Sequence, residues 1–286
     1  MAATEAHLTD AYGIDLHYRR WDAKNPVAVV QLVHGVGEHI GRYEHVAAFL
    51  NQHGFTVYGD DHRGHGKTGI LQHAGHPERL GRLGPGGHPA AVDGVNLMVE
   101  HIQAEHPELP HFVIGHSWGS FITQILLNQG RLDNVAGVVL SGSSYRMPGY
   151  LNAGDLNKPW RGPDSTGLEW LSRDPAVWQA FQDDPLTTSE PLMKLFGVVD
   201  ATRLFGRPKR GIDPELPMLL IVGSEDTVGG ARSVRRLERA YRERAGITDI
   251  RTIVYEGARH EPFNETNKDE VLQDVLAWLQ EHLPSA

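Results

Sequence analysis

Short apolar stretches alternate with amphipathic stretches along most of this chain. Near-continuous runs of β-branched and aliphatic residues are typical of strands buried on both faces of a parallel sheet. Such runs occur at 27–33, 55–58, 111–115, 135–140, 217–222 and 250–254. Segments with helical spacing follow most of them, at 43–53, 90–106, 120–127, 231–244 and 268–282. This alternation predicts an α/β protein with a mostly parallel sheet and helices on both faces.

The alternation stops between residues 144 and 215. This segment contains many prolines and three of the six tryptophans, and only short helices are predicted in it, at 166–171, 175–182 and 190–196. An apolar insertion between two parallel strands is most simply a lid over the carboxyl ends of the strands, where open α/β sheets bind ligands. We therefore predict a core formed by residues 1–143 and 216–286, with residues 144–215 as the lid. A small separate domain without a functional role is the alternative.

One short motif stands between a predicted strand and a predicted helix. It is Gly115-His-Ser-Trp-Gly119, which fits the pattern Gly-x-Ser-x-Gly. A serine on a tight strand-to-helix turn has its hydroxyl pushed clear of the sheet, and the new helix directs its first amides toward the same point. We therefore predict that Ser117 is a nucleophile. The alternative is an ordinary glycine-bounded turn that happens to contain serine.

A serine nucleophile needs a base, and the base needs an acid that orients it. Asp226 follows the predicted strand 217–222, and His260 follows the predicted strand 250–254. Both positions fall at carboxyl ends of strands, the edge that also carries the serine. The order serine, aspartate, histidine is the one this type of fold uses. Glu225 and Glu256 are rivals for the role of the acid.

Acyl transfer also requires two backbone donors that stabilise an oxyanion. The amide of Trp118 directly follows the nucleophile, and the amide of Val36 lies in the loop after the strand 27–33. Gly35 and Gly37 allow this loop to approach a substrate closely. We predict Val36 and Trp118 as the oxyanion hole; a plain glycine turn is the alternative and is compatible with it.

Four motifs together resemble the monoacylglycerol lipase/lysophospholipase group of α/β-hydrolases, over essentially the whole chain. They are His34-Gly-Val-Gly-Glu-His-Ile-Gly-Arg-Tyr43, Asp61-His-Arg-Gly-His-Gly66, Gly115-His-Ser-Trp-Gly119 and Glu256-Gly-Ala-Arg-His260. The resemblance implies an α/β-hydrolase fold with an eight-stranded, mostly parallel sheet and a helical lid inserted after strand 6. It further implies cofactor-independent hydrolysis of carboxylic esters through an acyl-enzyme, with Ser117, Asp226 and His260 at the family's triad positions.

The substrate is less sharply indicated than the chemistry. Gly35 and the aromatic residues of the predicted lid are candidates for substrate binding, and their apolar character suits monoacylglycerols or other small apolar esters. The lid candidates are Trp160, Trp170, Phe181 and Phe196. Trp118 stands where these lipases often carry methionine, and Gly-x-Ser-Trp-Gly-Ser is also similar to prolyl aminopeptidases. An amide hydrolase therefore remains an alternative, and a non-catalytic binding protein is a third.

Composition excludes several other classes. The net charge is −9 without a basic block, so we expect no nucleic-acid partner. The chain has no cysteine, which excludes disulfides and thiolate chemistry. It begins without a secretory signal and has no apolar run of membrane-spanning length, so we expect a cytoplasmic protein with at most transient contact with lipid surfaces. The oligomeric state is not predicted.

One polar cluster invites a metal-site interpretation. It consists of Asp60, Asp61, His62 and His65. No further carboxylate or histidine group with ligand spacing completes it, so we interpret the cluster as a tight turn after a strand and expect no metal.

Overall fold

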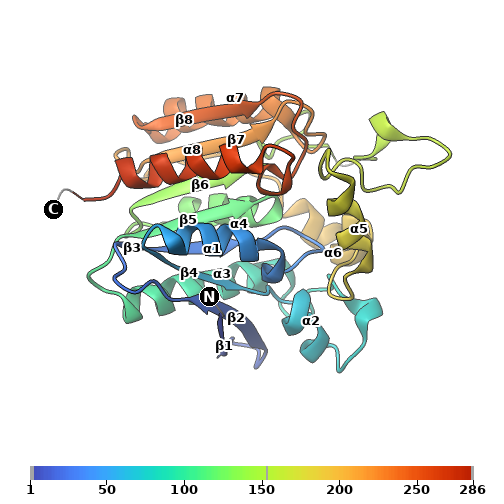
Figure 1. Cartoon of the computed structure of the whole chain (residues 1–286), viewed down its shortest axis with the longest axis horizontal. Coiled ribbons are helices and arrows are strands. Elements are labelled where there is room, and N and C mark those ends of the chain that lie inside the picture. Colours follow the sequence, from blue (N-terminus) through green and yellow to red (C-terminus); the bar gives the residue numbers. More distant parts are fainter. Residues whose placement is uncertain (1–2, 153, 285–286) are drawn as a thin grey trace.

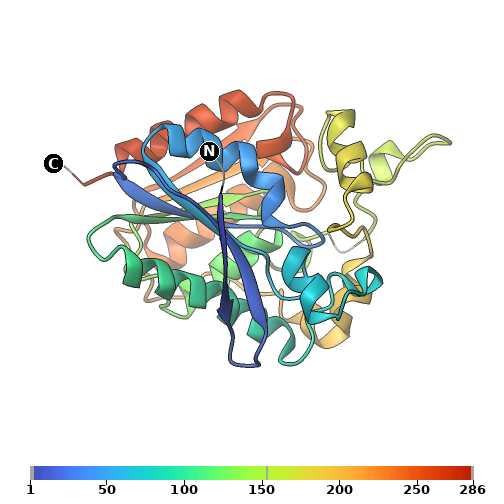
Figure 2. The same ribbon diagram turned by 60° about the horizontal axis from the view of Figure 1, so that its bottom comes forward.

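The fold is organised around one eight-stranded sheet (Figure 1). The computed structural model describes residues 3–152 and 154–284. The strands are β1 (Thr4–Thr9), β2 (Asp15–Trp21), β3 (Ala28–Val33), β4 (Phe55–Asp60), β5 (His111–His116), β6 (Gly137–Ser141), β7 (Met218–Gly223) and β8 (Ile250–Tyr255). Their spatial order is β1-β2-β4-β3-β5-β6-β7-β8. The β1–β2 hairpin pairs antiparallel with the edge of β4 (Figure 2), and the remaining pairs are parallel.

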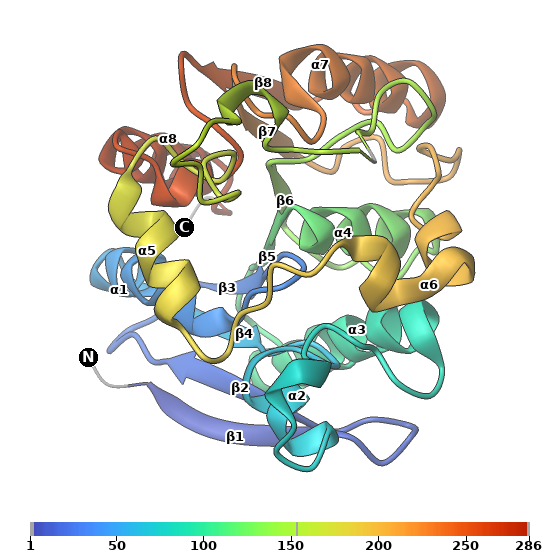
Figure 3. The ribbon, with the colours of Figure 1, turned by 90° about the vertical axis from the view of Figure 1, so that its right-hand side faces the viewer.

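Helices cover both faces of the sheet (Figure 3). One face packs on α1 (Glu44–Gln52) and α8 (Lys268–Glu281), the other on α3 (Gly87–Glu105), α4 (Trp118–Asn128) and α7 (Gly230–Ala240). Successive strand residues alternate between the two faces, as the pleat requires. In β6, Val138 and Leu140 contact the α4 side, whereas Val139 contacts the α8 side. The predicted fold class is therefore confirmed.

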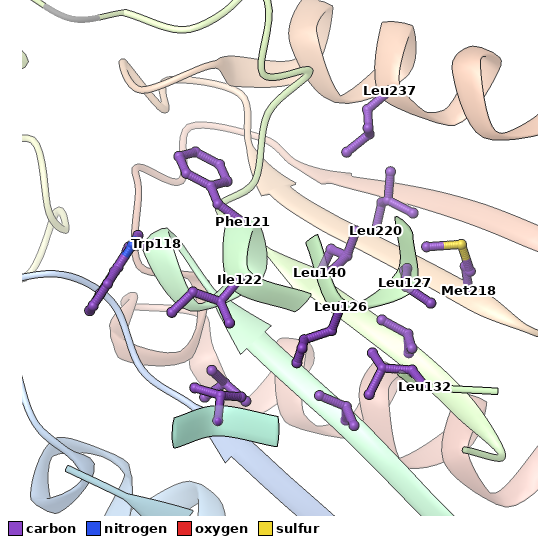
Figure 4. Packing of buried hydrophobic residues seen from close by; sticks show 14 of the residues in the cluster. Trp118, Phe121, Ile122, Leu126, Leu127, Leu132, Leu140, Met218, Leu220 and Leu237 are labelled. Atoms are coloured by element: carbon purple, nitrogen blue, oxygen red, sulfur yellow. The ribbon is translucent and has the colours of Figure 1, made fainter. Parts of the chain in front are cut away.

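The apolar face of α4 anchors the elbow region to the sheet (Figure 4). Trp118, Ile122 and Leu126 are at most 1% exposed and pack in one cluster with Leu140 and Leu220 from the strands. Fully burying a side chain of this size contributes about 1.5–3 kcal/mol. The first residue of α4 is thus held firmly at the carboxyl edge of β5.

The segment between β6 and β7 lies beyond the ends of the strands, at the right of Figure 1. It contains η3 (Lys158–Trp160), α5 (Pro175–Asp183) and α6 (Leu192–Thr202). Two of the three predicted short helices are therefore present. The predicted helix at 166–171 is wrong. Gly167 has a φ of +83°, which is not helical. The Glu169 carboxylate accepts hydrogen bonds from Asn157, Ser165 and Thr166, and these replace helical bonding.

The connection between β4 and α3 forms two further short helices. They are α2 (Gly66–Gln72) and η2 (Pro77–Arg79), while η1 (Ile40–Tyr43) precedes α1 and η5 (Pro262–Asn264) precedes α8. The segment Tyr241–Ala245 continues α7 as a π-helical turn, and this accounts for the longer helix predicted there. Within the described residues, every helix is too short or too polar to cross a lipid bilayer.

Candidate active site

Ser117 occupies a strained turn between β5 and α4. Its φ of 51° and ψ of −120° lie in a region that non-glycine residues seldom adopt. The turn is held by the Ser117 N–H, which donates to Ser141 O at 2.9 Å. A Cβ at Gly119 would lie 2.1 Å from Val33 O, so glycine is required for α4 to pack this closely on β3. The turn therefore has the geometry of a nucleophile elbow.

The structure brings together the three side chains that the sequence placed at strand ends. Ser117 Oγ lies 2.8 Å from His260 Nε2, and His260 Nδ1 lies 3.0 Å from Asp226 Oδ1. A carboxylate can only accept, so Nδ1–H donates to Asp226 and the neutral ring presents Nε2 as an acceptor for the Ser117 hydroxyl. This is the arrangement of a serine hydrolase triad at rest.

The environment of His260 raises the pKa of its imidazole. Burial of the ring opposes a positive charge, but the charge and hydrogen bond of Asp226, aided by Glu261 and Glu38, raise the pKa of His260 above its ordinary value. His116 lies beside it, with ring centroids 5.0 Å apart, and burial lowers the pKa of His116 to about 3. Neutral His116 therefore does not compete with His260 for a proton at neutral pH.

The two other acids considered for orienting His260 lie away from its imidazole. Glu225 and Glu256 are exposed, and Glu225 is 3.9 Å from Arg259 rather than near the imidazole. Asp226 is 6% exposed, and its Oδ1 also accepts the Val228 N–H at 2.8 Å. That hydrogen bond fixes the carboxylate, so only Asp226 among these three acids can orient His260.

The predicted oxyanion residues border Ser117. A Cβ at Gly35 would be 3.1 Å from Ser117 Cβ, which shows how closely the loop after β3 approaches the serine. Trp118 opens α4, where the first amides have no helical acceptor. Within the described residues, the N–H groups of Val36 and Trp118 have no backbone acceptor outside regular structure. Neither amide therefore has a competing backbone partner in this part of the chain.

A buried charge network that sequence reasoning missed supports this loop. Glu38 Oε1 accepts the Gly35 N–H at 2.6 Å and the Tyr43 hydroxyl at 2.8 Å. Arg42 Nη1 donates to Glu38 Oε2 at 2.6 Å, and both Arg42 Nη atoms donate to Glu261 at 2.7 Å. Since Glu261 directly follows His260, Arg42 ties the oxyanion loop to the histidine loop. The four-residue spacing of Glu38 and Arg42 was the available signal.

The aromatic candidates of the inserted segment have different surroundings. The Trp170 ring lies 4.9 Å from the His260 ring, and the Phe196 ring lies 5.0 Å from that of Trp118. Trp170 therefore contacts the triad directly, whereas Phe196 packs in the apolar cluster that contains the Trp118 ring. Phe181 is 6% exposed in a small cluster with two leucines of the same segment, under the Arg42 guanidinium.

Trp160 does not border the serine. Its ring lies under the guanidinium of Arg259, with 4.3 Å from the Arg259 Cζ atom to the ring centroid. Arg259 also donates to the carbonyl oxygens of Glu169 and Ser172. Trp160 therefore helps to attach the inserted segment to the loop that carries His260.

Most polar atoms of the Asp60–His65 cluster have protein partners, although, among the described residues, Asp60 Oδ1 and His65 Nε2 are buried without one. Asp60 Oδ2 pairs with His62 Nδ1 at 2.7 Å, and Asp61 accepts the N–H groups of Ile40 and Lys67 at 2.9 and 2.8 Å. These bonds are those of a tight turn that braces the oxyanion loop. The described residues contain no group of three or more histidines or carboxylates arranged to hold a metal ion.

Comparisons with known proteins place this site in a family. A family model described as serine aminopeptidase, S33 (Hydrolase_4) matches residues 24–267. Monoacylglycerol lipase of Mycolicibacterium smegmatis is 31% identical over 95% of each chain. Human monoglyceride lipase is 29% identical, over 98% of this chain and 91% of its own length.

Solved structures give the same result. A carboxyl esterase from Bacillus coagulans, solved with glycerol, has a TM-score of 0.84 at 24% identity over 99% of both chains, which speaks to the fold. A monoacylglycerol lipase from Paleococcus ferrophilus has a TM-score of 0.66 at 28% identity, over 93% of this chain and 99% of its own. The chain therefore belongs to the serine aminopeptidase S33 (Hydrolase_4) family of α/β-hydrolases, in its monoacylglycerol lipase-like group.

Proposed function

We propose that this protein is a serine hydrolase that cleaves the carboxylic ester of monoacylglycerols and related small apolar esters. The observation that carries the proposal is the 2.8 Å approach of His260 Nε2 to Ser117 Oγ on a strained elbow, with Asp226 behind the imidazole. The monoacylglycerol lipases among the relatives support the substrate class.

The proposed reaction proceeds through an acyl-enzyme. Ser117 Oγ attacks the ester carbonyl while its proton passes to His260 Nε2. The carbonyl oxygen becomes negative and accepts hydrogen bonds from the Val36 and Trp118 amides. The ester C–O bond then breaks, and the departing glycerol oxygen takes the proton from Nε2. Water, deprotonated by the same nitrogen, releases the fatty acid and restores Ser117.

We further assign residues 144–215 as a lid over this site. The segment is attached to the oxyanion loop by two polar contacts: Thr188 N–H donates to Gly37 O at 2.8 Å, and His39 Nε2 lies 2.8 Å from Asp184 Oδ2. Trp170 supplies apolar surface beside the His260 ring, and Phe196 packs on the ring of Trp118. Each methylene of an acyl chain buried against such surface contributes about 0.8 kcal/mol, so tail length would dominate substrate preference.

An aminopeptidase would need a free carboxylate near the serine to bind a substrate amine. The Glu169 carboxylate is occupied by Asn157 and Ser165, and Asp155 pairs with Arg161 at 2.6 Å. Glu261 next to His260 is neutralised by Arg42. These pairings favour the ester hydrolase over the amide hydrolase, although the family description names an aminopeptidase; a shared fold and triad do not fix the substrate.

The experiment compares ester and amide turnover in one preparation. Release of glycerol from monoacylglycerols of graded chain length is measured beside cleavage of proline arylamides, with the Ser117→Ala variant as the control. We expect kcat/KM to rise with acyl length and to exceed that of every arylamide, and the variant to be inactive. Faster cleavage of a proline arylamide than of any ester would overturn the substrate assignment.

We also propose transient contact of α6 with lipid surfaces. Met193, Val198 and Val199 are 51%, 67% and 66% exposed; Met193 precedes the kink at Gly197 within α6, and the two valines follow it. Replacing Val198 and Val199 with serine should reduce co-sedimentation with phosphatidylcholine vesicles that contain monoacylglycerol. Unchanged co-sedimentation would refute this contact. The cytoplasmic location stays a prediction.

A further inference from the structure

A cavity that does not include Ser117 lies on the α4 side of the sheet. It is bordered by the C-terminal end of α4, by residues 205–209 after α6 and by the turn after α7, three elements on the same side in Figure 3. Its volume of about 440 Å³ is within the range of small-molecule sites. Four basic side chains line it: Arg146, Arg207, Lys209 and Arg244. None of the lining residues is acidic, although the chain as a whole carries a charge of −9.

Arg146 is the buried cation of this cavity, with 1% exposure. Its Nε donates to Gln124 Oε1 at 3.1 Å and its Nη1 to Leu204 O at 2.6 Å. Its Nη2 has no protein acceptor within the described residues and lies beside Gly206, where a Cβ would be 2.9 Å away. Burial lowers the pKa of Arg146 to about 10, so the guanidinium keeps its charge at neutral pH. A buried charge without a counter-charge is costly.

The other three cations are also without acidic partners. Neighbouring arginines are paired: Arg203 contacts Asp200 at 2.6 Å, and Arg242 contacts Glu238 at 3.1 Å. In the described part of the chain, no carboxylate forms an ion pair with any of the four cations that line the cavity. The cavity therefore gathers four cations without acidic partners in the described residues, and Arg146 Nη2 lies beside Gly206 of its lining.

We propose that this cavity binds the phosphate group of a phosphate monoester. A phosphate dianion offers an oxygen to Nη2 of Arg146, the guanidinium nitrogen without a protein acceptor in the described residues, and balances more positive charge than a carboxylate does. Ile125 and Phe205 add apolar walls, and the volume leaves room for an organic group beyond the phosphate. The ester has two sources: a soluble phosphorylated metabolite, or the headgroup of an anionic phospholipid at a surface.

A purely structural role for Arg146 makes a different prediction. Arg146 also accepts the Gly206 N–H through its carbonyl at 2.8 Å, so it holds the 204–206 segment against α4. If this were its only role, phosphate esters would not bind saturably, and the surface cations Arg207 and Lys209 would have no effect on binding. The test therefore uses these two residues, whose replacement spares the buried interior.

The experiment measures glycerol 3-phosphate binding by calorimetry at constant ionic strength, with glycerate as the carboxylate comparison. We expect saturable binding that is weakened about tenfold or more in Arg207→Ala/Lys209→Ala, because charge-assisted hydrogen bonds are lost. The matched control is Arg235→Ala/Arg239→Ala, which removes two exposed cations of α7 outside the cavity and should bind as the wild type does.

A second arm identifies the source of the phosphate. Co-sedimentation with phosphatidylcholine vesicles is compared with and without phosphatidic acid, for the same variants. Binding to the soluble ester, or only to phosphatidic acid vesicles, with loss in the cavity variant alone, supports the site and names its source. Binding to neither, equal affinity of the cavity and control variants, or tighter binding of glycerate than of glycerol 3-phosphate would overturn the proposal.

Discussion

Replacement of Arg42 by methionine removes the only cation between two buried carboxylates, Glu38 and Glu261, which are 3% and 4% exposed within the described structure. Breaking a buried ion pair by removing one partner costs about 3–5 kcal/mol, because an uncompensated charge stays behind. We expect the Arg42→Met variant to lose about this much free energy of unfolding at pH 8. Arg251→Met is the matched control: Arg251 pairs with Glu281 on the surface, so its loss should stay within about 1 kcal/mol.

The pH dependence gives the prediction its sign. In the wild type, burial would raise the pKa of Glu261, but the charge and hydrogen bonds of Arg42 outweigh burial and hold this pKa below its ordinary value. The stabilisation is therefore present above the unfolded pKa of about 4.3 and is lost as the pH falls through the folded pKa. Without Arg42, burial raises the pKa of Glu261, so the variant binds more protons when folded and loses stability as the pH rises.

The assay is urea unfolding followed by tryptophan fluorescence between pH 5 and pH 8, beside ester turnover on the same samples. We expect the deficit of Arg42→Met to shrink toward pH 5, and Arg42→Met/Glu261→Gln to recover part of it at pH 8. Turnover should fall as well, since Glu38 holds the Gly35 amide. A deficit at pH 8 no larger than that of Arg251→Met, or one that grows toward acid, would refute the reasoning.

Three further predictions concern the triad and Trp170 of the proposed lid. Asp226→Asn should lower kcat by roughly 10⁴, because the imidazole loses its orienting acceptor. Glu256→Gln should leave kcat unchanged. Steady-state kinetics on one ester checks both variants. Activity should fall as the pH drops through the pKa of His260. Because Asp226 raises this pKa, the acidic limb of the kcat/KM profile should lie above the ordinary histidine pKa. An acidic limb below pH 6 in the wild type would argue against a raised pKa of His260. Trp170→Ala should reduce kcat by up to about tenfold, since such ring contacts contribute about 0.5–1.5 kcal/mol; an unchanged kcat would mean that the ring does not position His260.

Sequence predicts well those helices and strands whose apolar residues recur with one regular period. The strands and main helices follow from their apolar periodicity, and the elbow follows from glycines that a tight crossing demands. Because parallel strands share a carboxyl edge, Ser117, Asp226 and His260 were predicted to converge, and the structure places them in contact.

The features that sequence reasoning missed depend on partners far apart in the chain. Glu38 and Arg42 have the spacing of an ordinary helical ion pair, and only the fold brings Glu261 into contact with Arg42 as a second carboxylate. Aromatic composition likewise did not tell which side chains of residues 144–215 contact the triad: Trp170 contacts His260, whereas Trp160 packs on Arg259. The predicted helix at 166–171 failed because local side-chain hydrogen bonds compete with helical ones.

The account's central claim is that the imidazole of His260 makes the hydroxyl of Ser117 a nucleophile. The most direct test is the rate and position of covalent labelling by a fluorophosphonate, followed by mass spectrometry of the intact protein and of its peptides. The account predicts a single adduct on Ser117, with a labelling rate that rises with pH through the pKa of His260 and collapses in His260→Ala. An adduct on another serine, or equally fast labelling in that variant, would contradict it.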